Sequence, residues 1–217
     1  MRGTQRTAKL IAAAVVVALA AAACEGGRAS GPSSGAHTSS LTVSSLSPPD
    51  PTRLTASGCL GSASSAAPRT VGRYTIRIPS GWTDTGDYTH TESLLLELTA
   101  PASYGNPPSR IQFLALPYDV QRDFGTSTTA HSIAANEAKT HQHFTSPLSA
   151  ATSVADCSVA GEPAAVFGYA DGNERGYWLL FIHDNGLLGV RLFGTGGIGD
   201  QAIQEALSMI GSITWTV

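Results

Sequence analysis

The segment with the most motif-like spacing is Gly194-Thr-Gly-Gly-Ile-Gly199, which matches the G-x-G-x-x-G pattern of dinucleotide-binding proteins. It follows a predicted strand and opens a predicted helix, as that motif requires. A dinucleotide site also needs a second parallel strand and an acidic residue about 20 positions later. No acidic residue follows Glu205. We therefore interpret the segment as a glycine turn into a helix N-terminus, with anion binding by its free N–H groups as the minor alternative.

Histidine and aspartate side chains could supply metal ligands or a general base, but their spacing is unfavourable. His141 and His143 are two residues apart on a predicted helix, so their side chains point about 200° apart. His131 lies ten residues before His141, too far to complete a metal site. We interpret these histidines as solvated surface residues. His183 and Asp184 are adjacent at a predicted hairpin end, and adjacent strand residues point to opposite faces of a sheet.

An acidic pair, Asp119 and Asp123, brackets Arg122 at the spacing of a helical pair and could act as a general acid and base. A solvated loop explains the same residues and is the more frequent case. The sequence has no G-x-S-x-G nucleophile motif, P-loop, EF-hand loop or zinc signature. We therefore expect no catalytic residue, no cofactor and no metal site.

Aromatic residues outside the predicted core are more informative, because exposed rings often anchor partner proteins. Four lie at predicted strand ends or in loops and are our candidate partner-binding residues: Trp82, Tyr88, Tyr104 and Tyr118. Trp82 follows a strand-ending turn, so we expect its ring to be half in the core. The aromatic residues inside predicted strands are assigned to the core: Tyr74, Phe113, Trp178 and Phe181.

The first 23 residues have the organisation of an export signal. Arg2, Arg6 and Lys9 precede an uninterrupted apolar run of 14 residues, 10–23. A membrane-spanning helix needs about 20 apolar residues, so this run is too short for a permanent anchor. A positive start, a short apolar stretch and small residues at its end are typical of a cleaved signal peptide.

Cys24 follows this run directly, after the small residues Ala21, Ala22 and Ala23. The arrangement resembles the lipobox of bacterial lipoproteins, although Ala21 stands where those proteins usually carry leucine. The resemblance implies that the Cys24 thiol receives a diacylglyceryl group and becomes the N-terminus of a protein held at the outer face of the cell membrane. The alternative is an ordinary signal peptide with a coincidental cysteine.

Cys59 and Cys157 then remain as an even number of thiols in an oxidising compartment, which favours a disulfide between them. On the chain-entropy model, closing a loop of about 99 residues stabilises the fold by nearly 5 kcal/mol, less any native strain. Two unpaired buried thiols are the first alternative, and a zinc site is less favoured still.

Without residues 1–23 the chain has 10 basic and 16 acidic residues, a net charge of about −6. This charge disfavours nucleic acid and an electrostatic hold on anionic lipid, so membrane attachment would depend on the lipid at Cys24. Of the 44 residues 25–68, 33 are Ser, Gly, Pro, Thr or Ala, and none is aromatic. We predict a disordered tether over 24–68, although Cys59 could draw residues 54–60 onto the domain.

Residues 69–217 are predicted to form a single α+β domain. Tyr74, Ile76 and Ile78 alternate with polar residues, the pattern of a strand with one buried face. Asp184-Asn185-Gly186 is a strong type I′ hairpin signal. Strand blocks with one helix midway and one at the end indicate a mainly antiparallel sheet flanked by helices on both faces. The predicted strands cover 74–78, 94–98, 111–116, 154–159, 164–169, 177–183 and 187–193, and the predicted helices cover 128–144 and 200–210.

Two segments of this domain resemble the Mog/PsbP-like α/β/α sandwich proteins. Tyr74-Thr-Ile-Arg-Ile-Pro-Ser-Gly-Trp82 is similar to their opening strand and Pro-x-Gly-Trp turn, and Met209-Ile-Gly-Ser-Ile-Thr-Trp215 to their closing helix-to-strand segment. Exported actinobacterial lipoproteins of the LpqN/LpqT type also combine a lipobox, a low-complexity tether and this domain. The resemblance implies the fold and a protein-binding or accessory role, and the group has no shared catalytic residues to carry over.

These features lead us to expect an exported, monomeric lipoprotein whose domain is a non-catalytic protein-binding or accessory module. Its partner would be an unidentified envelope protein or lipid. The alternative is a carrier that holds a lipid or a small hydrophobic ligand in a cavity between helix and sheet. A hydrolase without a recognisable motif is the least favoured function. An apolar cavity favours the carrier, and a filled core with an exposed aromatic patch favours the protein-binding module.

Replacement of Cys24 by alanine is expected to release the protein from membranes into the medium, because no lipid would then be attached. Fractionation of expressing cells followed by immunoblotting measures the distribution of the wild type and of Cys24→Ala. Recovery of the variant in the membrane fraction, as for the wild type, would contradict lipid anchoring.

Overall fold

A computed structural model describes residues 47–62, 64–89, 93–140 and 148–216, which belong to one compact unit, 43–217. The predicted signal peptide, Cys24 and the tether up to residue 46 lie outside the described residues, as do His141 and His143. In the described part of the chain, no helix is long and apolar enough to cross a membrane.

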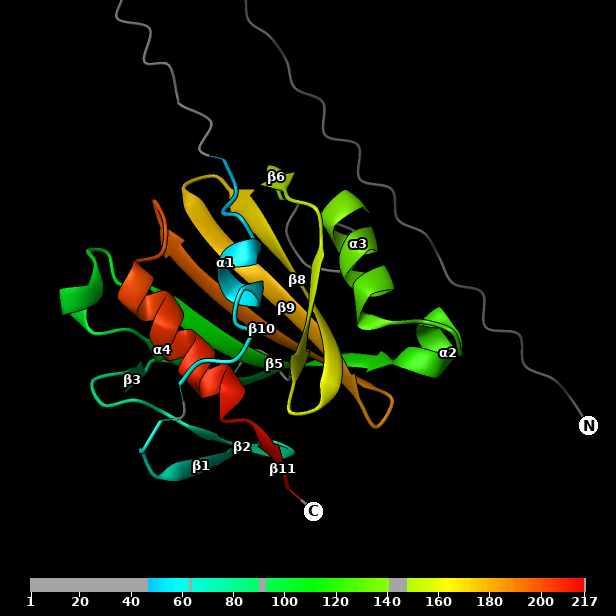
Figure 1. The fold of residues 1–217 in the computed structure, drawn as a ribbon, viewed down its shortest axis with the longest axis horizontal. Helices are drawn as coiled ribbons and strands as arrows, with labels where there is room; N and C mark the ends of the chain where they lie inside the picture. Colours follow the sequence, from blue (N-terminus) through cyan, green and yellow to red (C-terminus); the bar gives the residue numbers. More distant parts are fainter. Residues whose placement is uncertain (1–46, 63, 90–92, 141–147, 217) are drawn as a thin grey trace, which may run out of the picture. The chain divides into compact units, whose positions relative to one another are not determined.

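Eight described strands form one antiparallel sheet (Figure 1). They are β3 (Thr83–Asp84), β4 (Leu94–Thr99), β5 (Arg110–Asp119), β6 (Ala150–Ala151), β7 (Ala155–Val159), β8 (Glu162–Asp171), β9 (Glu174–His183) and β10 (Gly186–Thr195). Their order is β3-β4-β5-β10-β9-β8-β6, and β7 pairs with the same edge of β8 as β6 does. The long strands β5, β10, β9 and β8 therefore form the centre of the sheet.

A second, three-stranded sheet has the order β1-β2-β11. Its strands are β1 (Pro68–Val71), β2 (Tyr74–Arg77) and β11 (Thr214–Trp215), so it joins the start of the domain to its end. The described helical segments are α1 (Thr52–Thr55), the 3-10 turn η1 (Ala102–Tyr104), α2 (Val120–Phe124), α3 (Ala130–Thr140) and α4 (Asp200–Gly211).

Alternating side chains of β9 bury both faces of the large sheet. Leu179 and Phe181 pack in a core cluster with α4 and the small sheet, whereas Trp178 and Leu180 pack in a second cluster with α3. Because successive strand residues point to opposite faces, α3 and α4 cover opposite faces of the sheet. The predicted α+β fold, with a mainly antiparallel sheet and helices on both faces, is confirmed.

The two long helices begin differently. Thr129 and Ser132 exchange side-chain to backbone hydrogen bonds at the start of α3, which caps the helix. Gly199 is the N-cap of α4 and makes no side-chain cap, and Asp200, to which the spacing assigns the cap, is the first residue of the helix. Ile203, Ala206, Leu207 and Ile210, which follow the i, i+3, i+4, i+7 spacing of an amphipathic helix, lie on the buried side of α4.

The predicted hairpin turn joins β9 to β10. Asp184 and Asn185 have φ angles of +47° and +64°, and His183 pairs with Gly186 on either side of them. Positive φ at both central residues is the requirement of a type I′ turn, and Asp and Asn tolerate it better than most residues. The left-handed positions are therefore Asp184 and Asn185, and Gly186 is already the first residue of β10.

A disulfide joins Cys59 to Cys157 on β7, with 5.7 Å between their Cα atoms. It is the pair that the cysteine count favoured. Cys59 is buried in the core cluster that contains α4. The bond therefore fixes a segment that precedes the first strand to the edge of the large sheet.

The folded part of the chain begins earlier than predicted. Residues 47–62 were expected to belong to the tether, but Leu54 of α1 is only 1% exposed within the core cluster. The N–H of Gly61 donates to the carbonyl of Leu207 on α4 at 3.0 Å. Composition predicted a tether up to residue 68, because this segment contains few hydrophobic residues. The disulfide and a few buried contacts are nevertheless enough to hold it against the domain.

Removal of the disulfide is expected to lower the free energy of unfolding by about 2–5 kcal/mol, because the unfolded chain regains the freedom of a long loop. Urea denaturation of the double variant Cys59→Ala, Cys157→Ala against the oxidised wild type measures this change. Equal unfolding midpoints, with equal dependence on urea, would contradict a structural role for the bond.

Candidate functional site

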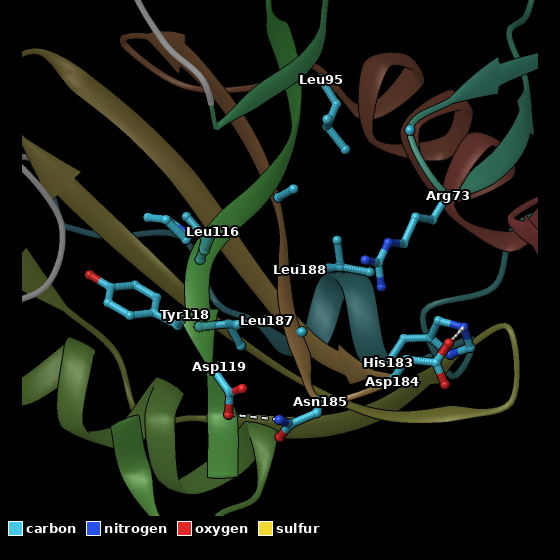
Figure 2. A pocket seen from close by; sticks show the side chains of 14 residues that line it. Arg73, Leu95, Leu116, Tyr118, Asp119, His183, Asp184, Asn185, Leu187 and Leu188 are labelled. Atoms are coloured by element: carbon cyan, nitrogen blue, oxygen red, sulfur yellow. Dashed lines mark hydrogen bonds and ion pairs between the residues drawn. The ribbon is translucent and has the colours of Figure 1, made fainter. Parts of the chain in front are cut away.

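A groove of about 520 Å³ opens at the turn end of the β9–β10 ladder (Figure 2). Four segments form its walls: the β1–β2 turn, the start of β4, the end of β5 and the β9–β10 hairpin. The lining residues are Gly72, Arg73, Leu95, Ala115, Leu116, Pro117, Tyr118, Asp119, His183, Asp184, Asn185, Gly186, Leu187 and Leu188. The volume lies within the range of about 300–1,000 Å³ that is usual for small-molecule sites.

The groove opens because β5 continues beyond the strand that covers its outer edge. β4 pairs with β5 only as far as Leu114, and the carbonyl of Ser93 then accepts the N–H of Ala115 at 2.8 Å. On the other edge the register between β5 and β10 shifts, so that Pro117 and Tyr118 have no partner residue in β10. A bulge of this kind bends the strand and interrupts the ladder, which leaves space beside it.

The walls of the groove are mainly apolar. Leu95 enters from one side and Leu188 of β10 lies on the same face of the sheet, whereas the side chain of Leu116 packs on the other face, as Tyr118 does (Figure 2). The β1–β2 turn approaches Leu95 so closely that a Cβ at Gly72 would lie 3.1 Å from its Cδ1 atom. Gly72 also has a φ of +59°, so the turn favours glycine here, and a Cβ would in addition require Leu95 to shift by a few tenths of an ångström.

Arg73 is the cationic residue of the groove lining. It is exposed at the β1–β2 turn, and its side chain extends into the groove toward Leu188 (Figure 2). Its backbone is held by the N–H of Thr216, which donates to the Arg73 carbonyl at 2.9 Å. Within the described ranges, the guanidinium has no hydrogen-bond or ion-pair partner. Its donors are therefore available to an acceptor group of a ligand.

His183 forms a polar rim of the groove. Its ring stacks on Trp215, with 3.6 Å between the centroids and 2° between the planes. The Nδ1 atom lies 2.9 Å from Oε1 of Glu162, and Nε2 lies 3.5 Å from Oδ2 of Asp184. The expectation that His183 and Asp184 point apart is wrong, because Asp184 is a turn residue and no longer follows the alternation of the strand.

The acidic pair at the end of β5 has a structural role. Asp119 is the N-cap of α2, where its carboxylate accepts the N–H of Arg122 at 2.9 Å and the side-chain amide of Asn185 at 2.7 Å. Asp123 accepts the Arg122 guanidinium and the N–H of Asp119. The hydrogen bond from the Arg122 N–H, followed by the one from Asn185, holds the pKa of Asp119 below its usual range. These contacts tie the hairpin turn to β5 at the base of the groove.

Three of the four candidate aromatic residues hydrogen-bond to acids of the domain. The Trp82 Nε1–H donates to Glu205 at 2.5 Å, and the Tyr104 hydroxyl donates to the other oxygen of the same carboxylate at 2.7 Å. Trp82 is 9% exposed, so the expectation of a half-core ring is corrected to a buried one. Tyr88 remains 43% exposed, and its hydroxyl donates to Asp84 at 2.6 Å.

Tyr118 lines the groove through only part of its side chain. Its ring packs edge-on against Phe124 of α2, with 5.4 Å between the centroids. Figure 2 shows this ring on the opposite side of β5 from Arg73. Desolvation by burial raises the pKa of the phenol. The groove is therefore lined by leucines and backbone more than by aromatic rings.

The glycine-rich segment is a turn, as predicted. A Cβ at Gly194 would collide with the carbonyl of Gly197, and one at Gly199 would collide with the carbonyl of Tyr104. Among the other histidine candidates, His131 lies exposed beside Asp156, with 2.7 Å between Nδ1 and Oδ1. In the part of the chain that the structure describes, no three His, Cys, Asp or Glu side chains gather as a metal site.

We expect Asp119→Ala to lower the stability of the domain at neutral pH. Because the folded-state pKa is depressed, the ionised carboxylate contributes stability above the unfolded pKa of about 3.9, and this is lost as pH falls through the folded-state value. The difference in urea midpoint between wild type and variant should therefore shrink between about pH 7 and about pH 3. A difference of the same size at both pH values would show that the carboxylate charge has no such role.

No family model matches the sequence, and no curated protein matches it. Solved structures with a similar fold include cyanobacterial PsbP (CyanoP) from Synechocystis, at 12% identity and a TM-score of 0.45, over 72% of this chain and 99% of that one. LpqN, involved in cell envelope biogenesis of Mycobacterium tuberculosis, is 12% identical with a TM-score of 0.42, over 70% and 86% of the two chains. A Bacteroides thetaiotaomicron protein is 11% identical with a TM-score of 0.31, over 66% and 45%. These solved structures include the two kinds of protein, PsbP-like and LpqN, that the sequence resembles.

Proposed function

We propose that this protein is an exported lipoprotein, anchored by a diacylglyceryl group at Cys24, whose domain is a monomeric, non-catalytic binding module. The signal-like residues 1–23 and the lipobox support export and anchoring. The disulfide between Cys59 and Cys157 suits an oxidising compartment outside the cytoplasm. The outer face of the cell membrane is therefore the site of action that we propose.

The ligand that we propose for the groove is an elongated apolar group with a hydrogen-bond acceptor, such as a carboxylate, at one end. The observation that carries this proposal is the combination of leucine walls with the unpartnered guanidinium of Arg73. Apolar walls contribute affinity through burial of the ligand surface. A single charged donor fixes the orientation of the ligand, which is the usual division of roles in small-molecule sites.

This ligand class favours the carrier alternative over a module that binds protein through aromatic rings. In the described part of the chain, the large hydrophobic side chains left exposed are Leu60 and Tyr88. Trp82 and Tyr104 are instead engaged by Glu205. The location differs from the predicted one, because the groove lies between the small sheet and the hairpin and not between a helix and the large sheet.

The lining of the groove also supports a binding role over hydrolysis. Its described residues include no serine, threonine or cysteine to serve as a nucleophile beside His183. Both ring nitrogens of His183 already face carboxylates, those of Glu162 and Asp184. These two contacts hold the imidazole in place at the edge of the groove, which suits a structural role better than that of a general base.

Titration of the secreted full-length Cys24→Ala protein with the fluorescent fatty acid cis-parinaric acid tests the proposal. We expect saturable binding that weakens about ten-fold in Arg73→Ala, because the carboxylate loses a charged donor worth about 1.4 kcal/mol. Leu95→Trp should also weaken binding, because the larger ring fills the groove.

Arg69→Ala is the matched control, since this exposed arginine pairs with Asp84 and is not among the residues that line the groove. It should bind the probe as the wild type does. The proposal is wrong if the wild type shows no saturable binding, or if Arg73→Ala and Leu95→Trp both bind the probe with unchanged affinity.

A further inference from the structure

A second cavity, of about 240 Å³, lies at the other end of the β9–β10 ladder from the hairpin. Arg175 and Tyr177 of β9 contribute to its lining, together with Arg53 of α1 and the glycines Gly196 and Gly197 that follow β10. Arg175 and Tyr177 are two residues apart on one strand, so they project from the same face of the sheet. The cavity is chemically unlike the groove, because its described lining includes two arginines and a phenol, with Ser47, Pro49, Ile198 and the two glycines completing it.

Arg175 is the unusual residue of this cavity. It is 5% exposed, and arginine is almost never buried to this degree unless its charge is paired. Its Nη1 atom donates to the carbonyls of Glu174 at 2.8 Å and of Gly172 at 3.4 Å. Its Nε atom is buried and has no acceptor among the residues that the structure describes. Among the described residues no carboxylate forms an ion pair with this guanidinium, so in this part of the chain its charge is buried without a counter-ion.

The donors that remain free on the Arg175 guanidinium suit an oxyanion. With Nη1 engaged by carbonyls, the Nε–H and the Nη2 group remain as a planar fork, which matches two oxygens of one oxyanion. Tyr177 adds a second donor, because its Oη is buried without a hydrogen bond of acceptable geometry in the described part. Arg53 lies beside this phenol and can only donate, so the phenolic proton stays free.

The described acidic residues nearby compensate the charge of Arg53 and form no ion pair with Arg175. Asp200 pairs with Arg53, and its side chain is 90% exposed. Asp50 accepts the N–H of Thr52 at 2.9 Å. Neither is among the residues that line the cavity. At Gly196 and Gly197 a Cβ would meet no atom within 4 Å, so this wall of the cavity is open to a ligand.

We propose that this cavity binds a phosphate group, held by the Nε and Nη2 fork of Arg175 with the Tyr177 hydroxyl and the Arg53 guanidinium as further donors. Donors from three separate side chains suit a tetrahedral anion with three or four acceptor oxygens better than a carboxylate with two. The phosphate can be a free anion or part of a phospholipid headgroup, and both share this chemistry. The proposal does not depend on the ligand of the groove.

Thermal unfolding of the native full chain in a phosphate-free, nonionic detergent buffer tests the site. We expect inorganic phosphate, from about 0.1 mM to about 20 mM, to raise the unfolding temperature saturably at constant ionic strength. Sulfate should act similarly, and acetate and chloride should have little effect. Arg175→Met should lower the phosphate affinity at least ten-fold while unfolding no earlier than the wild type without phosphate, because it removes an uncompensated buried charge.

Arg122→Met is the control, since it removes an exposed arginine away from the cavity, and it should respond to phosphate as the wild type does. If Arg175→Met does not fold, Tyr177→Phe should still lower the affinity several-fold, because it removes only the hydroxyl. Glycerophosphoglycerol, a water-soluble phospholipid headgroup, distinguishes the source: tighter binding than phosphate assigns a headgroup, and weaker binding assigns the free anion. The proposal would be overturned if phosphate did not raise the unfolding temperature of the wild type saturably, or if acetate raised it equally. It would also be overturned if Arg175→Met or Tyr177→Phe responded to phosphate as the wild type does.

Discussion

Ten antiparallel residue pairs join β9 to β10, from His183 opposite Gly186 at the turn to Glu174 opposite Thr195 at the far end. The turn that starts this ladder requires left-handed backbone at two successive positions. Alternation along the ladder then sends one row of side chains to α4 and the other to α3. A slip of one residue would exchange the two faces, so both core clusters depend on this one register.

The two proposed binding sites lie at the two ends of the same ladder. At the turn end, the register shift between β10 and β5 opens an apolar groove with an exposed arginine. At the far end, the glycine turn into α4 borders a polar cavity with a buried arginine. The first arrangement suits a ligand that is mostly apolar, whereas the second suits a compact anion.

The sequence predicts the strands, the Asp184-Asn185 turn and the two helices, because each depends on residues that are close together in the chain. The sequence does not predict the groove, because its walls come from four segments that only the tertiary fold brings together, and Arg73 has the sequence context of an ordinary solvated turn. Trp82 was misjudged because its partner, Glu205, is 123 residues away. The cysteine count indicated that Cys59 could draw residues 54–60 onto the domain, but the burial of Leu54 against the core comes from tertiary contacts that composition does not reveal. The solved structures named above are similar to this chain in fold. Both binding sites are proposed from the side chains of this chain alone.

The most direct test of the central claim is a methyl NMR titration of the domain with an apolar chain that ends in a carboxylate. Binding in the groove predicts saturable shifts for the methyl groups of Leu95 and Leu188, which line it on the face of the sheet opposite to α3. The methyl groups of Ile203 and Leu207, buried beneath α4, should stay unchanged. Shifts confined to α4, or no shifts at saturating ligand, would contradict a binding groove at the hairpin end of the ladder.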